Sequence, residues 1–79
     1  MKNITQRSEI VKIGEELLQK IRVSAAKTEE EAEEILKKEI YEKCDLYDAA
    51  TWRKIDTYVR DQIPALLLVK NKAIIRKDR

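Results

Sequence analysis

The chain has 79 residues, enough for one small domain whose single core is only just sufficient. It contains one Gly, one Pro and no Phe, and its 41% charged residues stand beside 43% hydrophobic residues. This composition favours a folded helical chain over intrinsic disorder, and the formal net charge of +2 does not by itself predict a polyanionic partner.

The charge is distributed unevenly along the chain. Residues 1–27 carry six basic and three acidic residues, and residues 28–48 carry three basic and nine acidic ones. Residues 49–63 are nearly balanced, with three basic against two acidic residues, and residues 64–79 carry five against one. An acidic middle between two basic ends predicts ion pairing within the chain or between copies as readily as it predicts an outside ligand.

The first helix is predicted to begin at Thr5 or Ser8 and to end near Ser24, because its apolar positions recur with the helical repeat. These positions are Ile10, Ile13, Gly14, Leu17, Leu18, Ile21 and Ala25. Glycine inside a helix costs about 1 kcal/mol relative to alanine. Gly14, in the middle of this apolar face, therefore indicates either the close approach of another helix backbone or a tolerated glycine with no role.

The second helix is predicted to begin after Thr28, because Thr28 and Glu31 have the spacing of a capping box. Its apolar face is narrower and consists of Ala32, Ile35, Leu36 and Ile40. Glu39 projects into that face. We expect Glu39 to be an edge residue that reaches solvent rather than a buried carboxylate with a functional pKa.

Residues 44–48 break the pattern, and Asp45 or Asp48 is expected to cap a third helix. The core stripe of this helix is Trp52, Ile55, Val59 and Ile63, with Tyr58 at its border. A residue before proline is biased away from the helical conformation, so the third helix is predicted to end at Ile63, before Pro64.

The last segment, residues 64–77, combines the densest apolar run of the chain with a basic end. As a helix it begins favourably at Pro64, but Lys70 and Lys77 then fall among its apolar positions. As a short β-hairpin it would turn at residues 70–71, and a lone hairpin is marginal in water. We favour the helix because Leu and Ala are strong helix formers. The misplaced lysines predict that another chain completes this segment.

No catalytic or cofactor-binding pattern is present. The chain has no histidine, which removes the usual general base and nearly all zinc sites. Its single cysteine, Cys44, cannot form a disulfide within the chain, so nothing indicates an oxidising compartment. The longest apolar run, residues 63–69, is far too short for a membrane span. We expect a cytoplasmic protein that is not an enzyme and has no metal, other cofactor, small-molecule substrate or membrane segment.

The sequence therefore predicts an all-α fold, a small three- to four-helix bundle in which residues 1–79 form a single domain with a basic C-terminal end. We expect it to act through protein–protein association, as a regulatory or structural accessory protein that binds itself, as a homodimer or higher oligomer, or a larger assembly. The expected interface residues are Trp52, Tyr58, Leu66, Leu67, Leu68, Val69, Ile74 and Ile75. Trp52 also fits the centre of the core, and we favour that placement because the chain has no Phe.

The alternative function is that of a helix-turn-helix-like DNA-binding regulator, with the third helix in the groove. The candidate nucleic-acid contacts are Arg53, Lys54, Arg60, Lys70, Lys72, Arg76 and Lys77. However, Arg53, Asp56 and Arg60 also have the spacing of a surface ion-pair ladder. The basic C-terminal end can equally balance the acidic second helix, within the fold or across a dimer.

Overall fold

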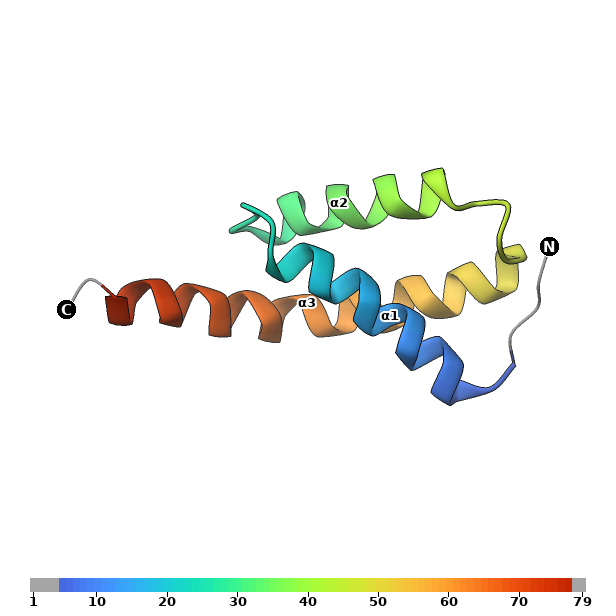
Figure 1. Ribbon diagram of the computed structural model, residues 1–79, viewed down its shortest axis with the longest axis horizontal. Helices are drawn as coiled ribbons and strands as arrows, with labels where there is room; N and C mark the ends of the chain where they lie inside the picture. Colours follow the sequence, from blue (N-terminus) through green and yellow to red (C-terminus); the bar gives the residue numbers. More distant parts are fainter. Residues whose placement is uncertain (1–4, 78–79) are drawn as a thin grey trace.

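Three α-helices make up the fold in the computed structural model, which describes the backbone of residues 5–77 and the side chains of residues 5–71. They are α1 (Arg7–Arg22), α2 (Glu29–Glu42) and α3 (Ala49–Lys77). Figure 1 shows α2 running back along α3 in the opposite direction, while α1 crosses α3 obliquely. The predicted all-α fold is confirmed. The segments predicted as a third and a fourth helix form one continuous helix, α3.

After α3, the helix α1 supplies the largest share of the core. It buries one face, made of Ile10, Gly14, Leu17, Leu18 and Ile21, as the sequence repeat predicts. The helix ends at Arg22, before the expected Ser24, because Ser24 donates to the carbonyl of Ile21 through both its backbone N–H and its side chain. The chain turns away there, and Ala26 is buried in place of Ala25.

Gly14 lies where α1 packs against α3, but the neighbour is a side chain and not a helix backbone. A Cβ placed on Gly14 would lie 2.8 Å from Cε2 of Tyr58 and still closer to Cδ2. The hydroxyl of Tyr58 donates to Glu15 Oε2 at 2.7 Å, which fixes the ring over the glycine. Gly14 is therefore required by packing, because any larger residue would displace this ring.

The capping box predicted for α2 is present. The Glu31 backbone N–H donates to Thr28 Oγ1 at 3.2 Å, and Glu31 Oε1 accepts from the Thr28 backbone N–H at 3.2 Å. Oε1 of Glu31 also accepts from the backbone N–H of Lys27, and this bond holds the pKa of the Glu31 carboxyl below its usual value. The capping box thus fixes where α2 begins.

The turn into α3 is ordered by two hydrogen bonds. Asp48, one of the two expected caps, accepts from the Thr51 backbone N–H at 2.9 Å. Trp52 is 8% exposed and donates from Nε1 to the Cys44 carbonyl, while its ring packs edge-on against Tyr47 with centroids 5.1 Å apart. Trp52 is therefore a core residue, the placement that the sequence favoured.

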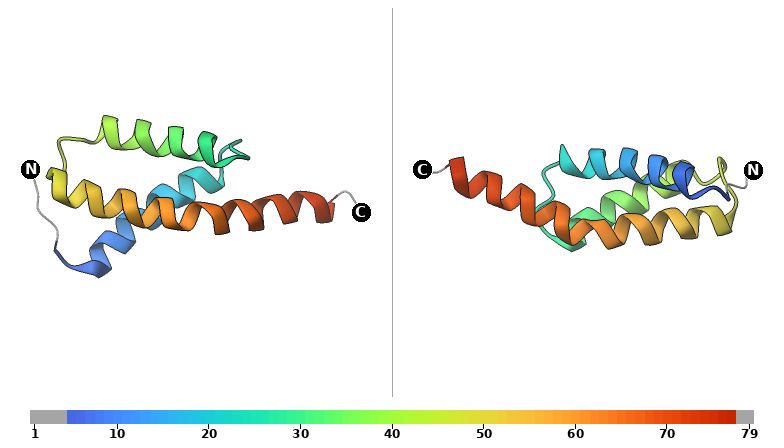
Figure 2. Two further views of the ribbon diagram at one scale, coloured as in Figure 1. Left: turned by 180° about the vertical axis from the view of Figure 1, so that it is seen from behind. Right: turned by 90° about the horizontal axis from the view of Figure 1, so that it is seen from below.

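The helix α3 continues through Pro64, so the predicted break at Ile63 is wrong, and the β-hairpin alternative is not supported. Proline inside a helix costs about 3 kcal/mol. Leu66 and Leu67, which follow it, are 8% and 6% exposed, and burying each contributes about 1.5–3 kcal/mol. Continuing the helix places both on the face of the core, and this gain outweighs the proline. Figure 2 shows α3 bending between its yellow and red parts, as helices containing proline do.

The core lies where the three helices meet. Its fully buried side chains include Ile21, Leu36, Ile55, Val59 and Ile63. The helix α2 contributes least, with only Ala32 and Leu36 buried. Within the described part of the chain, no helix has the combination of length and apolar character that a membrane span requires.

Candidate functional site

The C-terminal part of α3 extends past the rest of the molecule, and we call residues 68–77 the C-terminal arm. The helix α3 has 29 residues, which corresponds to a rod of about 43 Å at about 1.5 Å per residue. The longest dimension of the molecule is 48 Å against 22 and 15 Å for the other two. Figures 1 and 2 show the orange and red end of α3 projecting beyond α1 and α2. Beyond its base, the arm thus projects past both other helices.

The structure places the predicted interface residues in different surroundings. Trp52, Leu66 and Leu67 belong to the core of the chain, which removes them from an exposed surface. Leu68 and Val69 are 59% and 68% exposed at the base of the arm. Tyr58 is half-buried against Gly14. Ile74 and Ile75 lie on the α3 backbone, and their side chains are outside the described residues.

The structure shows why Lys70 falls among the apolar positions of residues 64–77, the pattern from which we predicted a partner chain. Its Nζ donates to the backbone carbonyls of Ser24 at 2.5 Å, Ala26 at 2.6 Å and Ile21 at 3.4 Å. The carbonyls of Ser24 and Ala26 belong to the loop that follows α1, and a cation there also matches the negative end of the α1 dipole. Lys70 therefore faces the bundle because it binds the end of α1, and it needs no second chain to do so.

Several predicted nucleic-acid contacts are engaged elsewhere or lie outside the described side chains. Arg60 pairs with Asp56 at 3.0 Å and with Glu33 of α2 at 2.9 Å, in line with the ion-pair alternative. Lys70 binds α1. The side chains of Lys72, Arg76 and Lys77 are outside the described residues. Arg53 and Lys54 remain, both exposed on α3.

Glu39 is more enclosed than expected. Its side chain is 14% exposed, and Oε1 pairs with Lys20 Nζ at 2.8 Å and with Lys43 Nζ at 3.3 Å. The hydrogen bond from Lys20 holds the pKa of the Glu39 carboxyl below its usual range. The carboxylate is thus ionised and joins α1 to the end of α2. A proton-transfer role would require a raised pKa, so we assign Glu39 a structural role.

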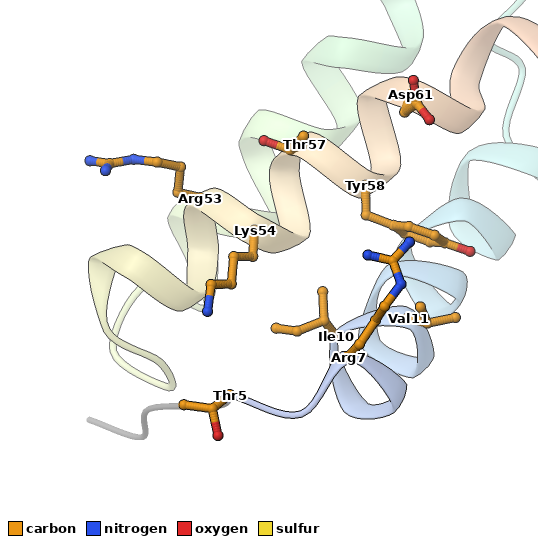
Figure 3. A pocket seen from close by; sticks show the side chains of 9 residues that line it. All are labelled: Thr5, Arg7, Ile10, Val11, Arg53, Lys54, Thr57, Tyr58 and Asp61. Carbon is orange, nitrogen blue, oxygen red and sulfur yellow. The ribbon is translucent and has the colours of Figure 1, made fainter.

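A cleft of about 570 Å³ opens between the start of α1 and the first half of α3, and we call it the cationic cleft. It is lined by Thr5, Arg7, Ile10, Val11, Arg53, Lys54, Thr57, Tyr58 and Asp61 (Figure 3). The sequence analysis identified Arg53, Lys54 and Tyr58 but did not bring them together with Arg7. Arg7 lies at the start of α1, far from Arg53 and Lys54 in the sequence, so no local pattern predicts that they line one cleft.

Figure 3 shows how the charges are arranged around the cleft. The side chains of Lys54 and Arg7 lie on either side of Ile10, with the Arg7 guanidinium beside the ring of Tyr58. Arg53 extends away from the other side chains, and Asp61 lies beyond Tyr58. Ile10 is 6% exposed, and Val11 and Tyr58 are half-buried. The cleft thus has an apolar floor, with a cationic side chain on either side of Ile10 and a carboxylate beyond Tyr58.

Comparison with known proteins gives no relative: no family model, curated protein or solved structure matches this chain. Within residues 5–77, no three carboxylate or thiol side chains are grouped as metal ligands would be. The candidate sites are therefore the C-terminal arm and the cationic cleft.

Proposed function

We propose that the chain acts through protein–protein association, with the C-terminal arm as the contact surface and a second copy of the chain as the partner. The observation that carries this proposal is the pair of exposed aliphatic side chains, Leu68 and Val69, on a helix that continues past the bundle. Helical segments of about ten residues gain most of their stability from packing rather than from propensity. A projecting aliphatic helix therefore gains from a surface that covers it.

Charge complementarity favours a second copy as that surface. Residues 64–79 carry five basic and one acidic residue, whereas residues 28–48 carry nine acidic and three basic ones. Much of this acidity is accessible, because Glu29, Glu30 and Glu34 of α2 are exposed, and Tyr41 on the same helix is 80% exposed. The arm of one copy can thus lie against α2 of another, and a two-fold arrangement would form two such contacts.

The mass of the protein in solution tests this proposal. Light scattering or sedimentation of the full chain is expected to give a dimer or a higher oligomer at tens of micromolar. Leu68→Asp and Val69→Asp are each expected to shift the protein toward monomer, because they place a carboxylate at the contact. A chain ending at Asn71 removes most of the arm and keeps Lys70, so the bundle stays intact while association is lost.

Leu46→Asp is the matched control for the arm variants. Leu46 is 54% exposed in the turn between α2 and α3, away from the arm. The Leu46→Asp variant should have the same oligomeric mass in solution as the parent protein. Added salt should weaken association, because surface charge attraction is screened. A full-length protein that stays monomeric at every concentration, or arm variants that associate like the parent, would rule out the proposal.

DNA binding is the second candidate, and it rests on Arg53 and Lys54, both exposed on one helix and without an ion-pair partner among the described side chains. Phosphate contacts of this kind give sequence-independent affinity with a steep salt dependence. Fluorescence anisotropy with a short labelled duplex at low salt tests it. Binding that weakens for Arg53→Ala and Lys54→Ala would support it, and no binding at low salt would exclude it.

A further inference from the structure

The cationic cleft is separate from the proposed association surface. It lies between the start of α1 and the first half of α3, whereas the C-terminal arm begins at residue 68. Figure 1 shows the start of α1 and the red end of α3 at opposite ends of the molecule. Its volume of about 570 Å³ falls within the range of small-molecule sites, about 300–1,000 Å³. A function of the cleft can therefore be tested without disturbing the arm.

The cations of the cleft differ from most cations that the structure places at helix contacts. Lys20, Lys43 and Arg60 each pair with a carboxylate, and Lys70 binds three carbonyls. Arg7 and Lys54, in contrast, make no hydrogen bond or ion pair with any side chain that the structure describes. Other surface lysines are unpaired as well, but these two come from different helices and lie on either side of the same hollow (Figure 3).

The floor between the two cations is apolar. Ile10 lies between them and is 6% exposed, and the half-buried Val11 and Tyr58 continue the surface toward Asp61. The ring of Tyr58 is held in place by its contact with Gly14 and by its hydrogen bond to Glu15. A fixed aromatic ring and a buried aliphatic side chain form a surface that an apolar group can cover without a change in the fold.

We propose that the cationic cleft binds a small organic anion, a phosphate or carboxylate attached to an apolar body. The anionic group lies between Arg7 and Lys54, where Arg can bind it through two hydrogen bonds and Lys as a point charge. The apolar body lies on Ile10 and Tyr58. Asp61, at the far end, excludes a second negative charge there, so a ligand with one anionic end is favoured over one charged at both ends.

Phenyl phosphate is the probe for this proposal, and the measurement is a titration followed by the backbone amide shifts of the full-length protein. We expect saturable shifts at residues 7, 10, 54 and 57, next to the cleft. Inorganic phosphate, which has the charge alone, should bind at least tenfold more weakly. Benzyl alcohol, which has the ring alone, should give no saturable shift at these positions.

Two variants identify the cations, and a third is their control. Arg7→Gln and Lys54→Gln are each expected to weaken phenyl phosphate binding at least fivefold. Both residues are exposed, so neither change should unfold the protein, and circular dichroism checks this. Lys37→Gln, an exposed position on α2, removes the same charge from the whole molecule and should leave binding within twofold of the parent.

Three results would overturn the proposal. The first is the absence of saturable shifts at millimolar phenyl phosphate, and the second is equal binding by the parent and both cleft variants. The third is a duplex DNA that binds far more tightly than phenyl phosphate and loses affinity in Lys54→Gln, which would assign these cations to a nucleic-acid surface. Because the C-terminal arm takes no part, the chain ending at Asn71 should bind phenyl phosphate as the full chain does.

Discussion

The two parts of α3, residues 49–67 and residues 68–77, both carry aliphatic side chains but have different surroundings. From Ala49 to Leu67 the helix lies against α1 and α2, and its apolar face is buried at Trp52, Ile55 and Val59. Leu68 and Val69, which follow, are exposed, and the helix then projects past the ends of α1 and α2. The difference shows that burial of this helix is decided by the lengths of α1 and α2, and not by the residues of α3 alone.

Removing an aliphatic side chain from each half should give the largest difference. Ile63 is 1% exposed, so Ile63→Ala should lower the free energy of unfolding by about 2–5 kcal/mol. Leu68→Ala should change it by less than about 0.5 kcal/mol. Urea unfolding followed by circular dichroism at low protein concentration measures both. If Ile63→Ala does not fold, Ile63→Val replaces it in the comparison, with an expected loss of about 0.5–1.5 kcal/mol in the free energy of unfolding. Equal losses at the two positions would contradict the division of α3.

Pro64 stands close to the boundary between the halves, and replacing it tests whether α3 is one helix. In an uninterrupted helix Pro64→Ala restores a backbone hydrogen bond and should raise the free energy of unfolding by about 2 kcal/mol. Proline is favourable at the first position of a helix. If α3 were two helices with Pro64 at the start of the second, the same change would lower stability. The sign of the change, measured by urea unfolding, separates the two arrangements.

Lys70 joins the base of the arm to the end of α1. Lys70→Met keeps most of the side-chain volume and removes the donor to the carbonyls of Ser24 and Ala26. We expect a loss of about 1–3 kcal/mol in the free energy of unfolding, because charged hydrogen bonds are lost and the carbonyls are left without this partner. Lys37→Met, at an exposed position on α2, is the control and should change stability by less than about 0.5 kcal/mol. If both variants unfold alike, Lys70 does not cap α1.

The ion pairs of Glu39 should have the smallest effect, and it depends on pH. The pKa of Glu39 is lowered in the folded state by Lys20, so its contribution is present above the ordinary carboxyl pKa of 4.5 and is lost as pH falls through the lower folded value. Glu39→Gln should cost up to about 1 kcal/mol at pH 7. The difference between parent and variant should shrink below pH 4.5. A difference that stays constant from pH 7 to pH 3 would show that Glu39 stabilises by packing alone.

The predictions that held were those with a local cause. The capping box of Thr28 and Glu31 fixes the start of α2, and the helical repeat of α1 identifies its buried face. The cap of α3 at Asp48 was one of two candidates, because Asp45 and Asp48 are both good capping residues near the expected start of the helix. These features depend on residues within one or two turns of each other, so the sequence is sufficient to predict them.

The predictions that failed involve residues far apart in the chain. The break at Pro64 follows from a local rule, but the burial of Leu66 and Leu67 against other helices outweighs it. Lys70 stands out as misplaced on a helical wheel until the end of α1, more than forty residues earlier, is placed beside it. Arg7 and Lys54 are likewise brought together only by the crossing of α1 and α3.

The sequence by itself determined that the chain is helical, where α2 begins and which faces of α1 and of the first half of α3 are apolar. The reason is that propensity, capping and periodicity act over a few residues. Only the tertiary structure decided that α3 passes through Pro64, that Lys70 caps α1 and that the cationic cleft forms. Each of these depends on which helices lie side by side. The free energy gained by burying side chains against another helix can outweigh a local cost such as that of Pro64, and the sequence of one segment does not reveal that gain.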